Sequence, residues 1–375
     1  MQSLSNLLDA IRREPNRQMA WDRIASNHII GTKTPTPFDV NNDYVVVKLA
    51  SMFLKNSRVL WLKLSPLAHA AITMTGRTGP QEQTAIIGPA QFGDLAAAPA
   101  DRTIVLHQRL AGPTVWRGGD LQVSAGLFAV PKDEAAGALL DTLGQLSGLA
   151  IPGLEEGVKI ARVVKSGIEG IIGLKGTQPV LGVKVGLGDP TVTAVGSEAA
   201  PCILAAIAAP ATDVKFESLW VRDGRLMEGP SPDALSVYER NDFLLVAIEK
   251  GPPRQDYRGL RSLAPHEGAF NTILRKPDIL RPDAEAELNA AFHNFDQDLS
   301  TESELTEPDK NRIRGEIIAD LKDRIVRKFG GPFGPEQRSV GGIQRRVDPE
   351  GFNFLDVGDR GAEFAKPAEP GALPF

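Results

Sequence analysis

Runs of apolar and β-branched residues follow one another closely along the first part of this 375-residue chain. Five such runs lie between positions 44 and 130, and each has the composition of a strand. Short segments with glycine, proline or asparagine separate them, as expected of turns. Because no helical pattern comes between these runs, we expect antiparallel pairing in a β-sandwich or barrel-like core. The predicted strands cover 44–50, 59–64, 70–75, 103–110 and 121–130.

The spacing of apolar residues becomes helical over 133–174. Asp133 is a suitable N-cap, and Leu139, Leu143 and Leu146 fall on one face of the helix that follows it. A proline and a glycine then interrupt the pattern, and a second, glycine-rich helical stretch comes after them. We expect the two helices to form an αα-hairpin that is inserted into the β core and packs on a sheet.

Patterns typical of strands return after this helical stretch. Asp223 and Gly224 separate two short apolar segments and form the clearest hairpin turn in the chain. Further on, Asp283 and Thr306 are suitable N-caps of two amphipathic helices. The sequence therefore predicts a mixed, mainly β fold: an antiparallel β-sandwich or barrel-like core with an inserted αα-hairpin and C-terminal helices. The later strands are expected at 179–185, 203–208, 216–221 and 242–249.

These patterns divide the chain into four parts. The last part is rich in glycine, proline and charge without sustained periodicity, so it is predicted to be loosely ordered. The parts are an N-terminal helix and lead-in at 1–43, a composite β core at 44–262 that includes the αα-hairpin at 133–174, a helical region at 263–330, and the tail at 331–375.

Composition and charge narrow the expected setting. A formal net charge of -5 argues against nucleic acid as a partner, because phosphate binding needs concentrated lysine and arginine. The N-terminus lacks the basic and apolar pattern of a secretory signal, and no apolar run is long enough to span a membrane. Cys202 is the single cysteine, which fits a reducing compartment and a small buried side chain. We therefore expect a cytoplasmic protein.

The most distinctive polar pattern lies at 292–307. Asp296, Asp298 and Ser300 are spaced like the first three oxygen ligands of a calcium-binding loop, and Glu307 falls at the position of its bidentate glutamate. The segment thus resembles a degenerate EF-hand over one motif, although Thr301 stands where that family has its turn glycine. The resemblance implies a Ca²⁺ site at these four residues. The alternative interpretation is a solvated acidic connection between antiparallel helices, and no other cofactor is expected.

Two further segments have features of partner-binding sites. One mixes arginines with an aromatic residue, a combination suited to phosphate or an acidic partner, although a solvated loop has the same composition. The other is an apolar cluster in the polar tail, which is suited to docking on this chain or on a partner. The candidate partner-binding residues are Arg254, Tyr257, Arg258 and Arg261 in the first segment and Phe352 and Phe354 in the second.

No complete catalytic signature or cofactor loop is recognisable, and the five histidines show no metal-binding spacing. The leading hypothesis is a non-enzymatic interaction or assembly protein that binds another protein through its β-sandwich body and its helical or tail segments. Two alternatives stay open. The helices at 133–174 are amphipathic enough for a membrane-acting effector. A hydrolase is the other alternative, because catalytic residues are often dispersed in sequence and gathered only by the fold.

Overall fold

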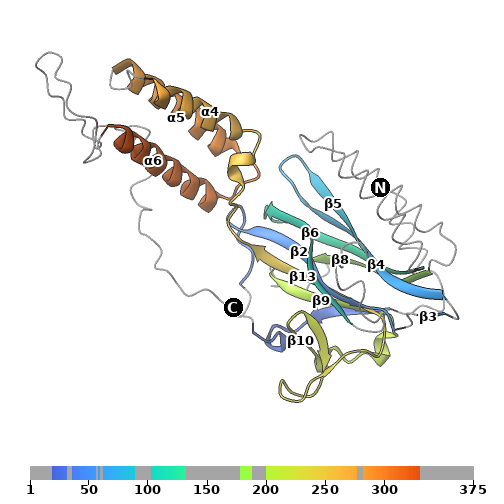
Figure 1. Ribbon diagram of the computed structural model, residues 1–375. Coiled ribbons are helices and arrows are strands. Elements are labelled where there is room, and N and C mark those ends of the chain that lie inside the picture. The colour runs from blue at the N-terminus through green and yellow to red at the C-terminus, as the bar shows by residue number, and fades with distance from the viewer. Residues whose placement is uncertain are drawn as a thin grey trace, which may run out of the picture. The chain divides into compact units, whose positions relative to one another are not determined.

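The computed structural model describes residues 19–31, 36–55, 58–59, 62–88, 103–131, 178–187, 200–276 and 282–329 (Figure 1). The chain forms two compact units, Met1–Pro253 and Arg254–Phe375. The predicted N-terminal helix, the predicted αα-hairpin at 133–174 and the tail at 331–375 lie outside the described residues.

The first unit contains a five-stranded antiparallel sheet in the order β1-β9-β13-β2-β6. Strand β13 pairs with β9 on one side and with β2 on the other, so segments about 200 residues apart in the chain become neighbours. A register shift beside Leu245 marks a bulge in β2. The strands are β1 Ala20–Ile24, β2 Tyr44–Phe53, β6 Ile104–Val115, β9 Cys202–Ile207 and β13 Phe243–Gly251.

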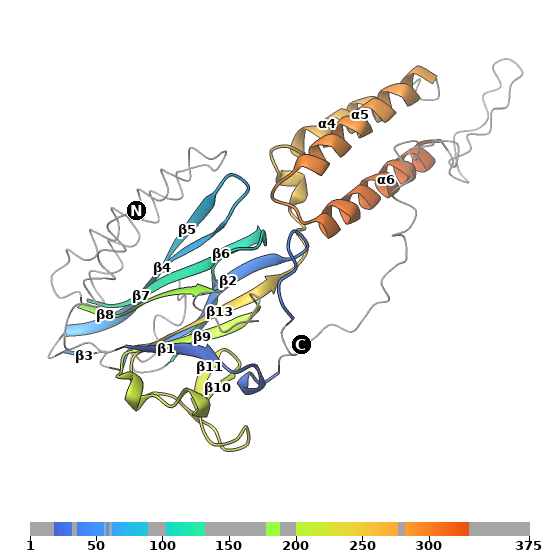
Figure 2. The ribbon, with the colours of Figure 1, turned by 180° about the vertical axis from the view of Figure 1, so that it is seen from behind.

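A second antiparallel sheet has the order β3-β4-β7-β8, and β5 also pairs with β4 (Figures 1 and 2). Its longest strand, β4, pairs with β7 over ten residue pairs from Leu64 to Thr73. The strands are β3 Arg58–Val59, β4 Leu62–Thr75, β5 Pro80–Ile87, β7 Leu121–Pro131 and β8 Gln178–Leu187.

The two sheets share one apolar core. Alternate residues of each strand point into it, as the two-residue period of a strand requires. Fully buried examples come from β2, β4, β7 and β13, among them Leu49, Ile72, Leu127 and Val246. The predicted antiparallel β-sandwich is confirmed, and the sheets stay open instead of closing into a barrel.

Gln83 of β5 joins the two sheets along one seam. Its side-chain Oε1 accepts a hydrogen bond of 2.8 Å from the backbone N–H of Gly112, and its Nε2 donates one of 3.0 Å to Oγ1 of Thr114, both in β6. Gly112 has φ +86, and a Cβ there would overlap the carbonyl oxygen of Val45 in β2. Only glycine fits this position without rearrangement.

A small third layer covers the outer face of the first sheet. It consists of the antiparallel strands β10 Leu219–Arg222, β11 Arg225–Glu228 and β12 Ser236–Val237. The hairpin β10–β11 confirms the turn predicted at Asp223 and Gly224. Leu226 packs with Phe243 and Leu245 of β13 in a second apolar cluster between this layer and the sheet. The short 3-10 helices η1 Ser26–His28, η4 Ala211–Asp213 and η5 Phe216–Ser218 lie in the connecting segments.

Several strand predictions need correction. The separate strands predicted at 59–64 and 70–75 are wrong, because β4 continues through both segments, and β5 was not predicted. The strand predicted at 103–110 is too short, because β6 continues through Gly112 and Pro113 to Val115. Strand β1 also lies inside the segment treated as a lead-in, where it pairs with β9. Strand β6 lies at the edge of its sheet, where such irregular residues are tolerated, so glycine and proline misled the prediction of its end.

Three α-helices lie in the part of the second unit that the structure describes, 254–276 and 282–329. These are α4 Ala264–Arg275, α5 Pro282–Thr301 and α6 Glu307–Phe329, with the 3-10 turn η6 Tyr257–Gly259 before them. The apolar stripes predicted for the last two helices are buried in one core, as are Phe270 and Leu274 of α4. The backbone N–H of Asp309 contacts Oγ1 of Thr306 at 3.4 Å, in keeping with the predicted N-cap.

The division between the units falls between Pro253 and Arg254, whereas the sequence analysis placed it between 262 and 263. Residues of η6 contribute to the helical core, and Tyr257 and Leu260 are buried in it. Among the described helices, none is both long and apolar enough to cross a membrane.

Candidate functional site

The residues of the EF-hand-like pattern do not form a loop around a common point. Asp296, Asp298 and Ser300 lie within α5, and Glu307 begins α6. Asp296 pairs with Arg314 at 2.5 Å, and Glu307 pairs with Lys310 at 2.9 Å. In the part of the chain that the structure describes, no group of three or more His, Cys, Asp or Glu side chains is arranged to hold a metal ion. The helical unit thus uses these carboxylates in ion pairs.

The aromatic and cationic residues predicted at 254–261 lie mostly inside a network of the helical unit. The Arg254 guanidinium contacts Asp256 at 2.8 Å and Glu304 at 2.7 Å. The hydrogen bond to Asp256 is the largest cause that raises the pKa of Arg254, and it outweighs the burial that lowers it. Arg254 therefore acts as a structural cation in this network.

Tyr257 is buried in the same network between two arginines. The guanidinium carbons of Arg258 and Arg312 lie 5.9 and 5.8 Å from its ring centroid, and its hydroxyl donates to Glu316 at 3.2 Å. Arg261 is exposed and makes no hydrogen bond or ion pair with any described residue. Arg258 is exposed as well, but its guanidinium lies 3.7 Å from Glu267, so Arg261 is the accessible cation of the predicted group without an ionic partner among the described residues. Phe352 and Phe354 lie outside the described residues.

The hydrolase alternative requires a nucleophile beside a histidine. His266 contacts Asp298 at 2.8 Å, but the nearby Ser262 hydroxyl donates to Glu302 instead. Burial raises the pKa of the Cys202 thiol to about 11, and Arg23 lowers it only in part, so the thiol is protonated at neutral pH. Neither the described histidines nor Cys202 forms a nucleophile and base pair. The helices proposed for the membrane-acting alternative, at 133–174, lie outside the described residues.

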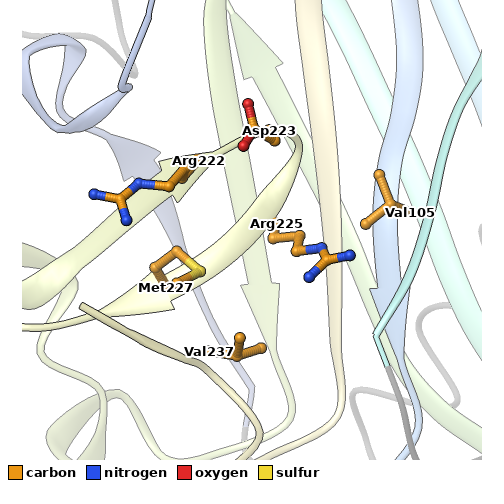
Figure 3. A pocket seen from close by; sticks show the side chains of 6 residues that line it. All are labelled: Val105, Arg222, Asp223, Arg225, Met227 and Val237. Atoms are coloured by element: carbon orange, nitrogen blue, oxygen red, sulfur yellow. The ribbon is translucent and has the colours of Figure 1, made fainter.

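A cleft beside the β10–β11 hairpin has the chemistry of a binding site. Its volume is about 340 Å³. Strand β6 forms one wall, and the three strands of the third layer supply the rest (Figure 3). The lining residues are Val105, Arg222, Asp223, Arg225, Met227 and Val237. We call this site the hairpin cleft.

Two arginines dominate the charge of the hairpin cleft. Arg222 and Arg225 are paired across the hairpin, where like charges destabilise a sheet. Arg222 donates from Nη2 to the carbonyl of Pro232 at 2.5 Å, and neither arginine forms an ion pair with any residue that the structure describes. Figure 3 shows the two side chains pointing away from each other, with Arg225 directed toward Val105. Their separation reduces the repulsion and leaves two guanidinium groups available to a ligand.

The hairpin is held firmly at its base and its tip. At the base, the His28 ring stacks on Trp220 with centroids 3.9 Å apart, and His28 Nδ1 lies 2.9 Å from the carbonyl oxygen of Leu219. The Trp220 indole N–H donates to the carbonyl of Gly229 at 3.0 Å. At the tip, Gly224 has φ +70 and packs so closely on His107 of β6 that a side chain would collide with the ring. The cleft is therefore largely preformed, which lowers the entropic cost of binding.

The hairpin was predicted from the sequence, but the cleft was not. The segment 222–225, Arg-Asp-Gly-Arg, contained one usable signal, because a tight turn places its flanking arginines opposite each other. The apolar wall could not be anticipated, since Val105 reaches the hairpin only through the pairing of distant strands. Met227 and Val237 follow the turn in sequence, but β-strand patterning alone gave no reason to treat them as a surface.

Comparison with known proteins found no matching family, no matching curated protein and no matching solved structure. The class is therefore defined by fold and site geometry alone. The chain is an antiparallel β-sandwich protein with a separate unit of three described helices and a cationic cleft beside a surface hairpin.

Proposed function

We propose that this chain is a non-enzymatic, cytoplasmic interaction protein that assembles with another protein through the hairpin cleft of its β-sandwich. The observation that carries the proposal is the pair Arg222 and Arg225, which stands beside apolar side chains without a carboxylate partner among the described residues.

The chemistry of the lining favours a protein partner. Arginine and methionine are enriched in protein interfaces, where a planar guanidinium recognises carboxylates through two parallel hydrogen bonds. A volume of about 340 Å³ is at the lower end of the range for small-molecule pockets, but it accommodates side chains from a partner's surface. Val237 is 38% exposed, so binding of such a surface would bury its apolar side chain and stabilise the complex.

The charge of the hairpin cleft indicates an acidic partner. The cleft combines two arginines with one aspartate, which is a local excess of one positive charge, whereas the chain as a whole carries -5. A partner with an acidic surface is therefore attracted to the hairpin cleft, whereas the rest of the chain has a net negative charge. This arrangement supports orientation-specific docking.

The test is an affinity pull-down of the full-length chain from lysate of its source, with bound proteins identified by mass spectrometry. A double variant, Arg222→Glu with Arg225→Glu, should lose a stoichiometric partner that the parent chain retains. Arg109→Glu is the matched control, because Arg109 is an exposed arginine of β6 that does not line the cleft. Tryptophan fluorescence confirms folding of the variants, since all four tryptophans precede Arg254.

Equal capture by the parent, the double variant and the control would contradict a role for the cleft. A chain that ends at Phe329 separates the contribution of the tail. A partner that is retained by this shortened chain, but lost by the double variant, assigns the contact to the sandwich. A partner lost only on shortening moves the contact to the segment that contains Phe352 and Phe354.

A further inference from the structure

We infer that the hairpin cleft recognises an extended peptide segment in which two carboxylates flank one apolar side chain. The inference rests on the proposed function and specifies its ligand. The recognised sequence is Glu-x-Leu-x-Glu, where x is any residue. Another acidic residue can replace either glutamate, and another apolar residue of similar size can replace the leucine.

The direction of the arginine side chains requires two separate anionic groups. Arg222 and Arg225 begin at directly opposed positions of the hairpin, but their side chains diverge (Figure 3). Because the two guanidinium groups point in different directions, two separate carboxylates match them better than one compact anion such as inorganic phosphate. Two carboxylates, one for each arginine, satisfy both cations.

The middle of the cleft requires an apolar group. Met227 follows Arg225 by two residues on β11 and is paired with Val237 of β12. In the view of Figure 3 it falls between the two guanidinium groups. Methionine adapts its shape to different apolar side chains, and valine adds a rigid apolar surface. A leucine, isoleucine or phenylalanine between the two carboxylates fits this wall, whereas a polar residue would leave it in contact with water.

An extended backbone supplies the required spacing. Successive side chains of a strand point to opposite faces, so residues i, i+2 and i+4 of a ligand face the cleft together. At roughly 3.3 Å per residue, the outer two Cα atoms are about 13 Å apart. Long glutamate side chains can then reach outward to the diverging guanidinium groups.

Asp223 makes the site selective among anions. Its carboxylate lines the cleft at the turn between the two arginines, where φ of +50 belongs to the hairpin geometry. A phosphate group carries about -1.5 to -2 charges at neutral pH, so it meets stronger repulsion from Asp223 than a singly charged carboxylate does. Asp223 can also accept a backbone N–H of the ligand.

The experiment measures fluorescence polarisation of labelled peptides with the full-length chain. The probe peptide is Gly-Glu-Ser-Leu-Ser-Glu-Gly, and the comparison peptides replace leucine by serine or both glutamates by lysine. The probe should bind at least tenfold more tightly than either comparison peptide. Arg222→Glu and Arg225→Glu should each weaken its binding about tenfold, which corresponds to about 1.4 kcal/mol, and Arg109→Glu should not.

A charge exchange separates recognition from damage to the fold. The double variant Arg222→Glu with Arg225→Glu should bind the lysine peptide more tightly than the glutamate peptide. A further peptide carries phosphoserine in place of each glutamate of the probe. The parent chain should bind the glutamate probe more tightly than this phosphopeptide, and Asp223→Asn should reduce the difference in affinity between the two. Reversed preference in the double variant supports direct recognition, because an unfolded hairpin would bind neither peptide selectively.

Three results would overturn the inference: no probe binding at about 1 mM peptide, equal binding of all three peptides, or displacement of the probe by inorganic phosphate at equal concentration. If the pull-down partner still depends on Arg222 and Arg225, the proposed function survives and only the ligand class is wrong. If the partner is captured equally by the charge-reversed chain, the proposed function fails as well.

Discussion

The helical unit and the β-sandwich use their arginines in different ways. Arg254, Arg312 and Arg324 of the helical unit each contact two carboxylates of that unit. Arg222 and Arg225 of the sandwich line a cleft without an ion pair to any described residue. A guanidinium that already contacts two carboxylates has few free hydrogen-bond donors for a partner. The arginines of the helical unit therefore stabilise that unit, whereas those of the cleft can bind a ligand.

The units also differ in the range of the contacts that hold them. In α6, Arg312 pairs with Asp309 and Glu316, which lie three and four residues away. In the sandwich, Lys48 of β2 pairs with Glu249 of β13 across 201 positions of sequence. The helical unit thus combines ion pairs set by helical spacing with pairs such as Arg254–Glu304 and Arg324–Glu267, which join residues 50 and 57 positions apart. The Lys48–Glu249 pair of the sandwich depends on strand register. Three predictions test this contrast, from the largest expected effect to the smallest.

The first prediction compares glycine-to-alanine substitutions in the two units. Gly112→Ala should destabilise the sandwich by about 4 kcal/mol or more, because the new Cβ overlaps Val45 and the backbone is left-handed. Gly315→Ala in α6 should stabilise the helical unit by about 1 kcal/mol, since its Cβ would point into open space. Urea denaturation measures both, with tryptophan fluorescence for the sandwich and helical circular dichroism for the other unit.

Gly31→Ala is the control for backbone strain alone. Gly31 has φ +85, like Gly112, but no heavy atom lies within 4 Å of its Cβ position. The expected cost is about 1 kcal/mol. A similar loss at Gly31 and Gly112 would mean that close approach to Val45 is unimportant.

The second prediction concerns His69 in β4. Its side chain is buried, its Nε2 has no hydrogen-bond partner among the described residues, and burial lowers its pKa from 6.5 to about 4. The unfolded chain therefore binds this proton more readily, so the free energy of unfolding falls as pH decreases through 6.5 toward 4. The contribution lost by pH 4.5 is about 2.5 kcal/mol.

His69→Met should remove this part of the pH dependence while keeping an apolar side chain of similar volume. The measurement is urea denaturation at pH 7.5 and 4.5, followed by tryptophan fluorescence. Identical pH dependence of the parent chain and His69→Met would refute the assignment.

The third prediction tests the ion-pair network of the helical unit. The Asp309 carboxylate accepts hydrogen bonds from the Arg254 backbone N–H at 2.8 Å and from Arg312 Nε at 2.9 Å, and its side chain is 4% exposed. Asp309→Ala should cost about 2 kcal/mol, because both donors lose a buried acceptor. Loss of helical circular dichroism in urea measures the effect.

Asp323→Ala is the matched control in the same helix. Asp323 pairs with Arg327 at the surface, where such pairs contribute at most a few tenths of a kcal/mol. Equal effects at Asp309 and Asp323 would show that the buried network is no more important than a surface ion pair. The tryptophan signal of the sandwich should not change with either variant.

The sequence was most informative where structure depends on neighbouring residues. The two C-terminal helices and the turn at Asp223 and Gly224 follow from spacing and local conformational preference, and the structure confirms them. The N-cap predicted at Asp283 is wrong, because α5 begins at Pro282 and Asp283 lies within its first turn. The EF-hand-like pattern shows the limit of this approach. Its spacing matched a ligand loop, but α5 continues to Thr301. The carboxylates of Asp296, Glu307 and Asp298 instead contact arginine, lysine and histidine side chains.

By itself, the sequence determined the mainly β class, an antiparallel core of sandwich or barrel-like type and the C-terminal helices, because periodicity of two or 3.6 residues encodes which faces are buried. Only the tertiary structure decided which strands pair, why Gly112 is required, and that Val105 completes a cleft around Arg222 and Arg225. Those features join segments up to about 200 positions apart. Apolar periodicity specifies that a strand needs a partner but does not specify which one, so contacts of this range are settled by packing of the whole sandwich.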